Sequence, residues 1–269
     1  MMITIFTIAG SAVYAAEIPV SDQDQLITSS DWTEISNLQD EMKKEEPDAT
    51  IDYDKALKVY VDCNLIKLQT ADTKKLTSAL ESANYVWVIP FKMEKTYGMF
   101  TVAKGLPLSE EAKSVLTKAE QEEVKNHAGK WMITETAEHT VEPYYDILLE
   151  KREALSDCTR VVLVGSQPGM RQPVALGMDD ETARIWISLG YQYPVMEKIP
   201  ETQNVESGVY SFDSVAEISD TYIEDSEVST GAGVQSRSSM KYVAGIGIVL
   251  IGSILILSVL KKKKIKSED

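Results

Sequence analysis

The chain has 269 residues, and its 27 Lys and Arg residues against 42 Asp and Glu residues give a formal net charge of −15 at pH 7. This acidic balance argues against nucleic acid as a partner, because a phosphate backbone binds basic surfaces. Only two Cys and two His residues are present, which excludes a disulfide-dense small scaffold and a four-cysteine zinc site. A hydrophobic content of 43% is sufficient for a packed core.

The C-terminal part of the sequence predicts a membrane anchor. Tyr242 to Leu260 form an uncharged run of 19 residues, which is long enough to cross a hydrocarbon core of roughly 30 Å as a helix. Basic residues clustered beside a span stay on the cytoplasmic side, and here they are Lys261, Lys262, Lys263, Lys264 and Lys266. We therefore predict a transmembrane helix at 241–260 in the lipid bilayer and a cytoplasmic tail at 261–269. A buried core helix is the alternative.

The N-terminal residues predict a signal peptide at 1–15. Residues 3–13 are apolar, and small residues follow at Ala15 and Ala16, as signal peptidase requires. The run lacks the preceding Lys or Arg that such signals usually have. An N-terminal core strand is the alternative.

Between these two ends the sequence predicts one extracellular domain and a stalk. Residues 220–240 are rich in Ser, Thr and Gly, a composition typical of a flexible tether. Residues 16–29 are also polar, and we expect them to form a loose leader. Residues 30–219 remain as a single domain. The segment 16–240 has 21 basic and 40 acidic residues, so the extracellular part is strongly acidic.

In the first half of the domain, the pattern of apolar residues predicts two helices, a strand and a hairpin. Trp32, Ile35 and Met42 recur at helical spacing, whereas the residues from Leu57 to Cys63 alternate between apolar and polar as a strand with one buried face does. In chain order we expect a helix at 31–45, a strand at 57–63, a helix at 72–83, and two strands of a hairpin at 85–89 and 99–103.

In the second half of the domain, the sequence predicts further helices and strands, and the strands are expected to pair largely antiparallel. Thr117 and Glu120 have the spacing of a capping box, so the helical stretch at 109–127 is expected to divide into two helices. The mixture of hairpins and helices predicts an α+β fold with a largely antiparallel sheet. The further expected elements are a strand at 130–138, a helix at 142–155, strands at 160–165, 172–178 and 184–189, and a helix at 211–218.

The loop 165–173 is the candidate ligand-binding segment. It is packed with turn-forming residues between two strands, and its backbone amides are predicted to form an anion-binding concavity. The candidate ligand-binding residues are Ser166, Gln167, Gly169 and Arg171, of which the arginine could hold a carboxylate by two hydrogen bonds. The alternative is an ordinary hairpin loop. Val164 stands where a nucleophile elbow requires its first glycine.

Cys63 and Cys158 leave two alternatives open. Outside the cell an even pair of cysteines is compatible with a disulfide, which would stabilise the fold by up to about 4–5 kcal/mol in the chain-entropy model. The other alternative is two buried free thiols.

From the histidines and the acidic clusters we predict no catalytic residue, no metal site and no cofactor. His127 and His139 each stand alone in the sequence. The acidic residues around Asp52 and Asp179 lack the ligand spacing, central glycine and closing glutamate of a calcium loop.

The order of segments resembles that of uncharacterised exported, single-pass surface proteins of Gram-positive bacteria. The short segments Asp52 to Ala56, Gly105 to Pro107 and Gly129 to Trp131 are also similar to members of that group. The resemblance implies an anchored extracellular domain and assigns no active site.

These observations favour a non-enzymatic binding or scaffold module at the cell surface, whose partner is a surface protein or glycan. The alternative function is a membrane-anchored extracellular hydrolase with its site near the loop 165–173. A signal-transducing receptor is a third hypothesis.

Overall fold

The computed structural model describes residues 18–139, 141–165, 167, 170, 172–191, 193, 195–201 and 204–219. The predicted signal peptide at 1–15, stalk at 220–240, transmembrane helix at 241–260 and tail at 261–269 lie outside these residues. Among the helices that the structure describes, none has the length and apolar character needed to span a bilayer.

A single ten-stranded sheet organises the domain, in the order β5-β4-β3-β2-β6-β7-β8-β10-β9, with β1 pairing with β3 outside this path. The pairing of β2 with β6 is parallel, and the other strand pairs are antiparallel. The prediction of an α+β fold with a largely antiparallel sheet is confirmed. The strands are β1 Thr50–Ile51, β2 Leu57–Tyr60, β3 Tyr85–Lys92, β4 Tyr97–Lys104, β5 Trp131–His139, β6 Arg160–Val164, β7 Val174–Met178, β8 Ala183–Ser188, β9 Asn204–Glu206 and β10 Val209–Ser211.

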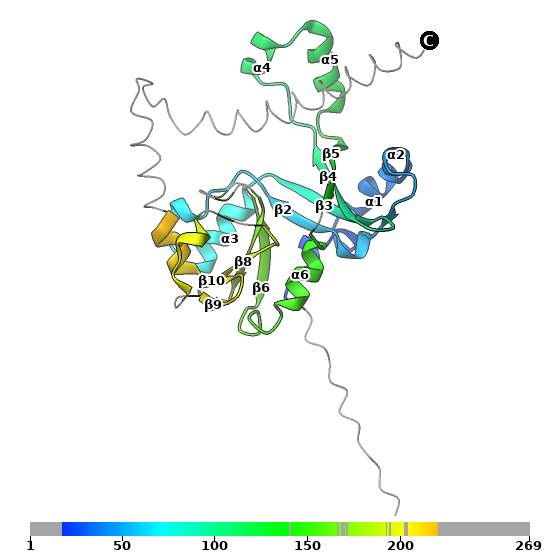
Figure 1. Cartoon of the computed structure of the whole chain (residues 1–269). Helices are drawn as coiled ribbons and strands as arrows, with labels where there is room; N and C mark the ends of the chain where they lie inside the picture. The colour runs from blue at the N-terminus through cyan, green and yellow to red at the C-terminus, as the bar shows by residue number, and fades with distance from the viewer. Residues whose placement is uncertain are drawn as a thin grey trace, which may run out of the picture.

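Helices lie on both sides of the sheet and beyond one of its ends (Figure 1). They are α1 Trp32–Ile35, α2 Gln39–Glu45, α3 Thr73–Glu81, α4 Glu110–Val115, α5 Lys118–His127 and α6 Tyr144–Glu150. Residues 212–219 are also helical, close to the predicted helix at 211–218. The expected helix at 31–45 is instead divided, because a 3-10 turn at Ser36–Leu38 separates α1 from α2.

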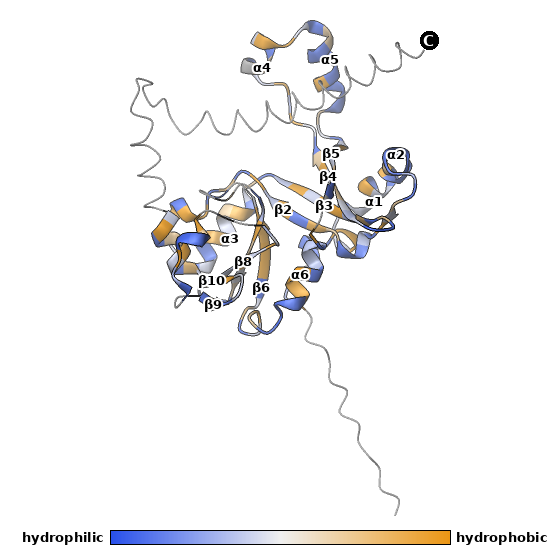
Figure 2. Ribbon diagram, in the orientation of Figure 1, coloured by the Kyte–Doolittle hydropathy of each residue, from blue (hydrophilic) through white to orange (hydrophobic). Residues whose placement is uncertain are grey.

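Successive side chains of each strand point to opposite faces of the sheet, so the hydrophobic core is divided into a layer on each face. In β6, Val161 and Leu163 belong to the first-face core, which also contains Leu148 of α6, whereas Val162 and Val164 face the opposite side. That opposite side contains two separate clusters. We call them the α3 core, which includes Leu76, Leu80 and Trp186, and the α1–α2 core, which includes Ile35, Met42, Trp87 and Phe100. The hydrophobic colouring of β6 agrees with burial on both faces (Figure 2).

Residues 18–29 are part of the packed domain, which corrects the prediction of a loose leader at 16–29. Two 3-10 turns, Asp22–Asp24 and Leu26–Thr28, run across the sheet. Ile18 and Val20 enter the first-face core, and Leu26 enters the α1–α2 core with no exposed surface. We call residues 18–31 the N-terminal strap. Its buried apolar residues follow no helical or strand period, so the pattern that identifies regular elements does not detect them.

Candidate functional site

The predicted ligand-binding loop is described only in part. Ser166, Gly169 and Arg171 lie outside the described residues, whereas Gln167 is described and is 3% exposed. Its Oε1 accepts a hydrogen bond from the backbone N–H of Leu65 at 3.0 Å. Its Nε2 donates to the carbonyl oxygens of Cys63 at 2.6 Å and Gly165 at 3.0 Å. Gln167 therefore joins the end of β6 to the segment after β2. The hydrogen bonds of its side-chain amide are made to backbone groups of the chain itself.

The two cysteines are free thiols in this structure. Cys63 packs against the α3 core, whereas Cys158 belongs to the first-face core. The sheet lies between these cores, so of the two alternatives that the sequence leaves open the structure contains the pair of separate thiols. Burial raises the pKa of the Cys63 thiol to about 12 and that of the Cys158 thiol to about 11. Neighbouring carboxylates, Asp62 and Asp179 respectively, act in the same direction.

We expect both thiols to resist alkylation in the folded protein. With a pKa of about 11, only about a thousandth of a thiol is ionised at pH 8, and the thiolate is the reacting species. Intact-mass analysis after iodoacetamide treatment at pH 8 should show no adduct on folded protein and two adducts in urea without reductant. A requirement for reductant before the second adduct forms in urea would show that the cysteines are bridged.

The acidic clusters do not assemble a metal site. Within the residues that the structure describes, no group of three or more His, Cys, Asp or Glu side chains has the arrangement needed to hold a metal ion. The Asp179 carboxylate accepts hydrogen bonds from the backbone of Glu181 and Thr182 and pairs with Arg184. The backbone bonds come first among the causes that hold its pKa below the usual value. This carboxylate thus closes the turn of the β7–β8 hairpin.

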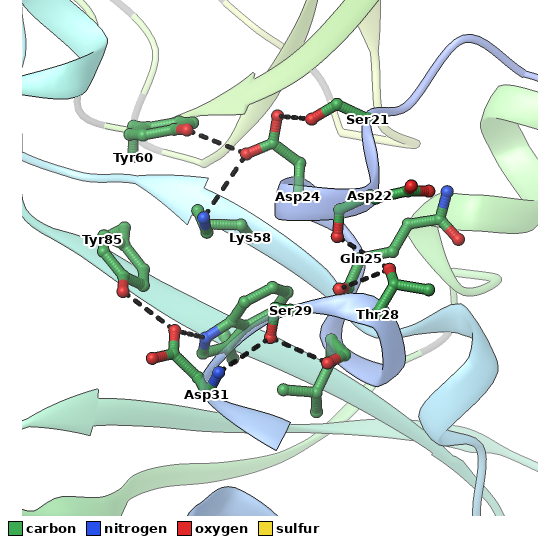
Figure 3. A network of polar contacts seen from close by, with 12 residues as sticks. Ser21, Asp22, Asp24, Gln25, Thr28, Ser29, Asp31, Lys58, Tyr60 and Tyr85 are labelled. Carbon is green, nitrogen blue, oxygen red and sulfur yellow. Dashed lines mark hydrogen bonds and ion pairs between the residues drawn. The ribbon is translucent and has the colours of Figure 1, made fainter. Parts of the chain in front are cut away.

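A cluster of ionisable groups lies under the N-terminal strap, and the sequence patterns did not identify it (Figure 3). We call it the buried polar network. Asp24 and Asp31 come from the strap, and the sheet supplies the other members from three adjacent strands. These are Lys58 and Tyr60 of β2, Tyr85 and Trp87 of β3, and Arg160 of β6.

The register of β2 and β3 places Lys58 among aromatic rings. Leu57 and Val59 enter the first-face core, so Lys58 between them faces the opposite side. Lys58 pairs with Trp87 across the strands, as Tyr60 pairs with Tyr85. The Lys58 ammonium lies 4.6 Å from the Tyr85 ring centroid, 5.3 Å from that of Trp87 and 5.9 Å from that of Tyr60. These distances are within the range of cation–π attraction. The polar face of β2 is therefore buried, unlike the predicted strand with one buried face.

Two carboxylates of the strap complete the network. Asp24, which is 2% exposed, accepts hydrogen bonds from the Tyr60 hydroxyl at 2.8 Å and from Arg160 Nη2 at 2.9 Å. Its Oδ1 lies 3.7 Å from Lys58 Nζ. Asp31 accepts from the Tyr85 hydroxyl at 2.9 Å and from Trp87 Nε1 at 3.0 Å. Two carboxylates therefore balance one ammonium and one guanidinium.

The network shifts the acid–base equilibria of its members. Burial lowers the pKa of Lys58, although the Asp24 and Asp31 carboxylates oppose this shift. Burial, together with the nearby carboxylates, raises the pKa of Tyr60 and of Tyr85. Both phenols accordingly remain hydrogen-bond donors at neutral pH. Their contribution to stability is present below the normal tyrosine pKa near 10 and is lost as pH rises above it. Both carboxylates of this site are paired with donors of the sheet, although Arg160 Nε is buried without a hydrogen-bond partner. The chemistry of the site therefore suits holding the strap onto the sheet.

The α4–α5 arm, residues 106–129, is the other feature of functional interest, because it projects away from the sheet (Figure 1). At its base, Gly105 N donates to the Lys130 carbonyl at 2.9 Å and Gly129 N donates to the Gly105 carbonyl at 2.8 Å. No arm residue is a member of the three hydrophobic clusters that the described residues form.

Local contacts hold the arm together. Ser109 caps α4, and Thr117 and Glu120 form the predicted capping box at the start of α5. Gln121 Nε2 donates to the carbonyl oxygens of Lys113 and Leu116, which joins the two helices. Leu106 is 43% exposed and Val115 is 70% exposed. These two side chains give the arm an apolar surface without a partner inside the described part of the chain. Helices this short are marginal in water unless they pack against other elements, so a partner that covered this surface would stabilise the arm.

A comparison of this chain with protein-family models, curated proteins and solved structures finds no match. The resemblance to exported surface proteins of Gram-positive bacteria therefore stays a prediction, and function is argued from the residues of this chain.

Proposed function

We propose that the protein is a non-enzymatic binding or scaffold module, anchored in the cell membrane with its folded domain outside the cell. The observation that carries the binding role is the α4–α5 arm, which exposes Leu106 and Val115 and contributes to no hydrophobic cluster of the described domain. A segment outside these clusters is available for a contact with a surface protein or glycan.

Two features support this role over a catalytic one. The described part of the candidate loop uses Gln167 as a backbone brace. The buried polar network pairs its carboxylates with its own cations, tyrosines and tryptophan. The location rests on the sequence alone, namely the uncharged run from Tyr242 to Leu260, the lysines after it and the signal-like segment at 1–15.

Crosslinking on intact cells tests the role of the arm. We expect the double change Leu106→Ser and Val115→Ser to lower the yield of the crosslinked partner about tenfold, because exposed apolar anchors carry much of the energy of an interface. The matched control changes Leu68 and Val205 to serine. These side chains are 44% and 56% exposed and lie outside the arm, so the control should keep the yield of the parent protein.

The same cells test the location, because protease added outside should digest the domain. Equal crosslinking by the arm variant and its control would overturn the role of the arm. Protection of the domain from external protease while the cells are intact would overturn the extracellular location.

A further inference from the structure

The β5 strand forms one edge of the sheet and pairs with β4 along its whole length, from Trp131 opposite Lys104 to His139 opposite Tyr97. In the part of the chain that the structure describes, no strand pairs with its other side. It has nine residues, whereas β9 at the opposite edge has three. A long edge presents a row of backbone donors and acceptors to any extended chain that approaches it, and proteins usually restrict such edges.

Two features of β5 restrict what can pair with it. The register shifts at Thr101 and Val102 of β4, which marks an irregularity next to Thr134, and such bulges limit indiscriminate pairing. Glu135 and Glu138 are exposed. They lie opposite Thr101 and Gly98 respectively, and because they are three residues apart they project from opposite faces of the sheet. Any added strand therefore meets a carboxylate on each face.

These carboxylates select against a second copy of the same strand. If two β5 strands paired antiparallel about Glu135 or about Glu138, that glutamate would lie opposite its own copy. If they paired about the point midway between the two, Glu135 of one strand would face Glu138 of the other. Like charges directly opposite each other destabilise a strand pair. The 131–138 segment contains no Lys or Arg to relieve the repulsion.

We propose that β5 receives an extended strand of a partner protein that carries Lys or Arg at positions facing Glu135 and Glu138. Main-chain hydrogen bonds would give such strand addition its affinity, and the side chains its specificity. This inference rests on the proposed binding role and names a surface and the chemistry of its partner. The β5 strand begins directly after Lys130 at the base of the arm, so a strand added there runs up to the arm and the two surfaces are continuous.

Fluorescence anisotropy of a labelled peptide tests the proposal on the full-length protein in detergent. The probe is a nine-residue peptide of threonine and valine with two lysines three positions apart, so that one lysine projects from each face of the added strand, and we expect it to bind. A peptide with glutamate in place of each lysine should bind at least about tenfold more weakly, because its charges repel Glu135 and Glu138. A lysine peptide N-methylated at four consecutive central residues keeps its charges but loses backbone donors along both of its edges, and its binding should weaken by a similar factor.

Charge-reversal variants locate the binding surface. The double change Glu135→Lys and Glu138→Lys should weaken binding of the lysine peptide about tenfold and favour the glutamate peptide. The matched control changes Glu81 and Glu153 to lysine. Both residues are exposed and lie outside β5, so this control alters the net charge equally and should keep the parent affinity within about twofold.

Three outcomes overturn the proposal, and a comparison with the crosslinking result separates it from the role of the arm. If the N-methylated peptide binds as well as the parent peptide, the contact is diffuse attraction to an acidic protein. If both charge-reversed variants weaken binding equally, β5 is not the surface. If sedimentation shows a dimer that the β5 variant abolishes, a second copy takes the edge. If the peptide does not bind but crosslinking still depends on the arm, strand addition is rejected and the role of the arm stands. If the peptide binds but crosslinking does not depend on the arm, the role of the arm is rejected and strand addition stands.

Discussion

Replacing Asp24 with alanine should lower the free energy of unfolding by about 3–5 kcal/mol, the usual effect of removing one partner of a buried ion pair. Asp24 is 2% exposed and is the carboxylate that both Arg160 and Lys58 contact in the buried polar network. Without it, two cations remain beneath the strap, and the Tyr60 hydroxyl loses its acceptor. Urea unfolding monitored by tryptophan fluorescence measures the change.

The neighbouring aspartate supplies a matched control for this measurement. Asp22 lies in the same 3-10 turn but is exposed, so Asp22→Ala should change the free energy of unfolding by no more than about 0.5 kcal/mol. Adding Lys58→Met to Asp24→Ala should recover part of the loss, because one of the uncompensated charges is then gone. An Asp24→Ala protein as stable as the Asp22→Ala protein would show that the network does not hold the strap.

Replacing Leu26 with alanine should cost about 2–5 kcal/mol, the range for deleting a buried leucine side chain. Leu26 has no exposed surface and packs in the α1–α2 core. The next residue, Ile27, is 38% exposed and belongs to the same 3-10 turn. Ile27→Ala should therefore cost less than about 1 kcal/mol.

The pair tests whether the strap is part of the cooperative fold. Thermal unfolding followed by circular dichroism should separate the two variants by several degrees, since about 1 kcal/mol moves the midpoint of a domain this size by roughly 2–4 °C. Equal midpoints for Leu26→Ala and Ile27→Ala would mean that the strap dissociates before the domain unfolds.

The parts of the fold that the sequence predicts well are those with a local pattern. The capping box at Thr117 and the β-branched residues of β6 sit where propensity and periodicity place them. The hairpin of β3 and β4 was also expected from its two apolar runs, although each strand extends further than predicted, to Lys92 and from Tyr97 respectively.

The parts that the sequence does not predict depend on distant contacts. Lys58 and Tyr60 follow the alternation of a strand whose polar face meets water. Here that face is covered because Asp24 reaches it from a strap without regular structure, and Arg160 joins from a position 136 residues further along the chain. A period of two identifies a strand but does not show whether a second layer covers its polar side. The same limit applies to Gln167, whose partner Leu65 lies 102 residues away.

The strap also affects the order in which the domain can fold. It crosses the parallel junction of β2 and β6, since Val20 bridges Val161 of β6 and Gln25 bridges Leu57 of β2. Its binding surface does not exist until the chain has been made as far as β6, although the strap itself is synthesised first. Contacts between residues so far apart in sequence close slowly, because a long loop must be ordered before they form. We therefore expect the first residues of the domain to wait in an unfolded state and to dock late, and a chaperone or a nearby surface would have its best access to the protein during that interval.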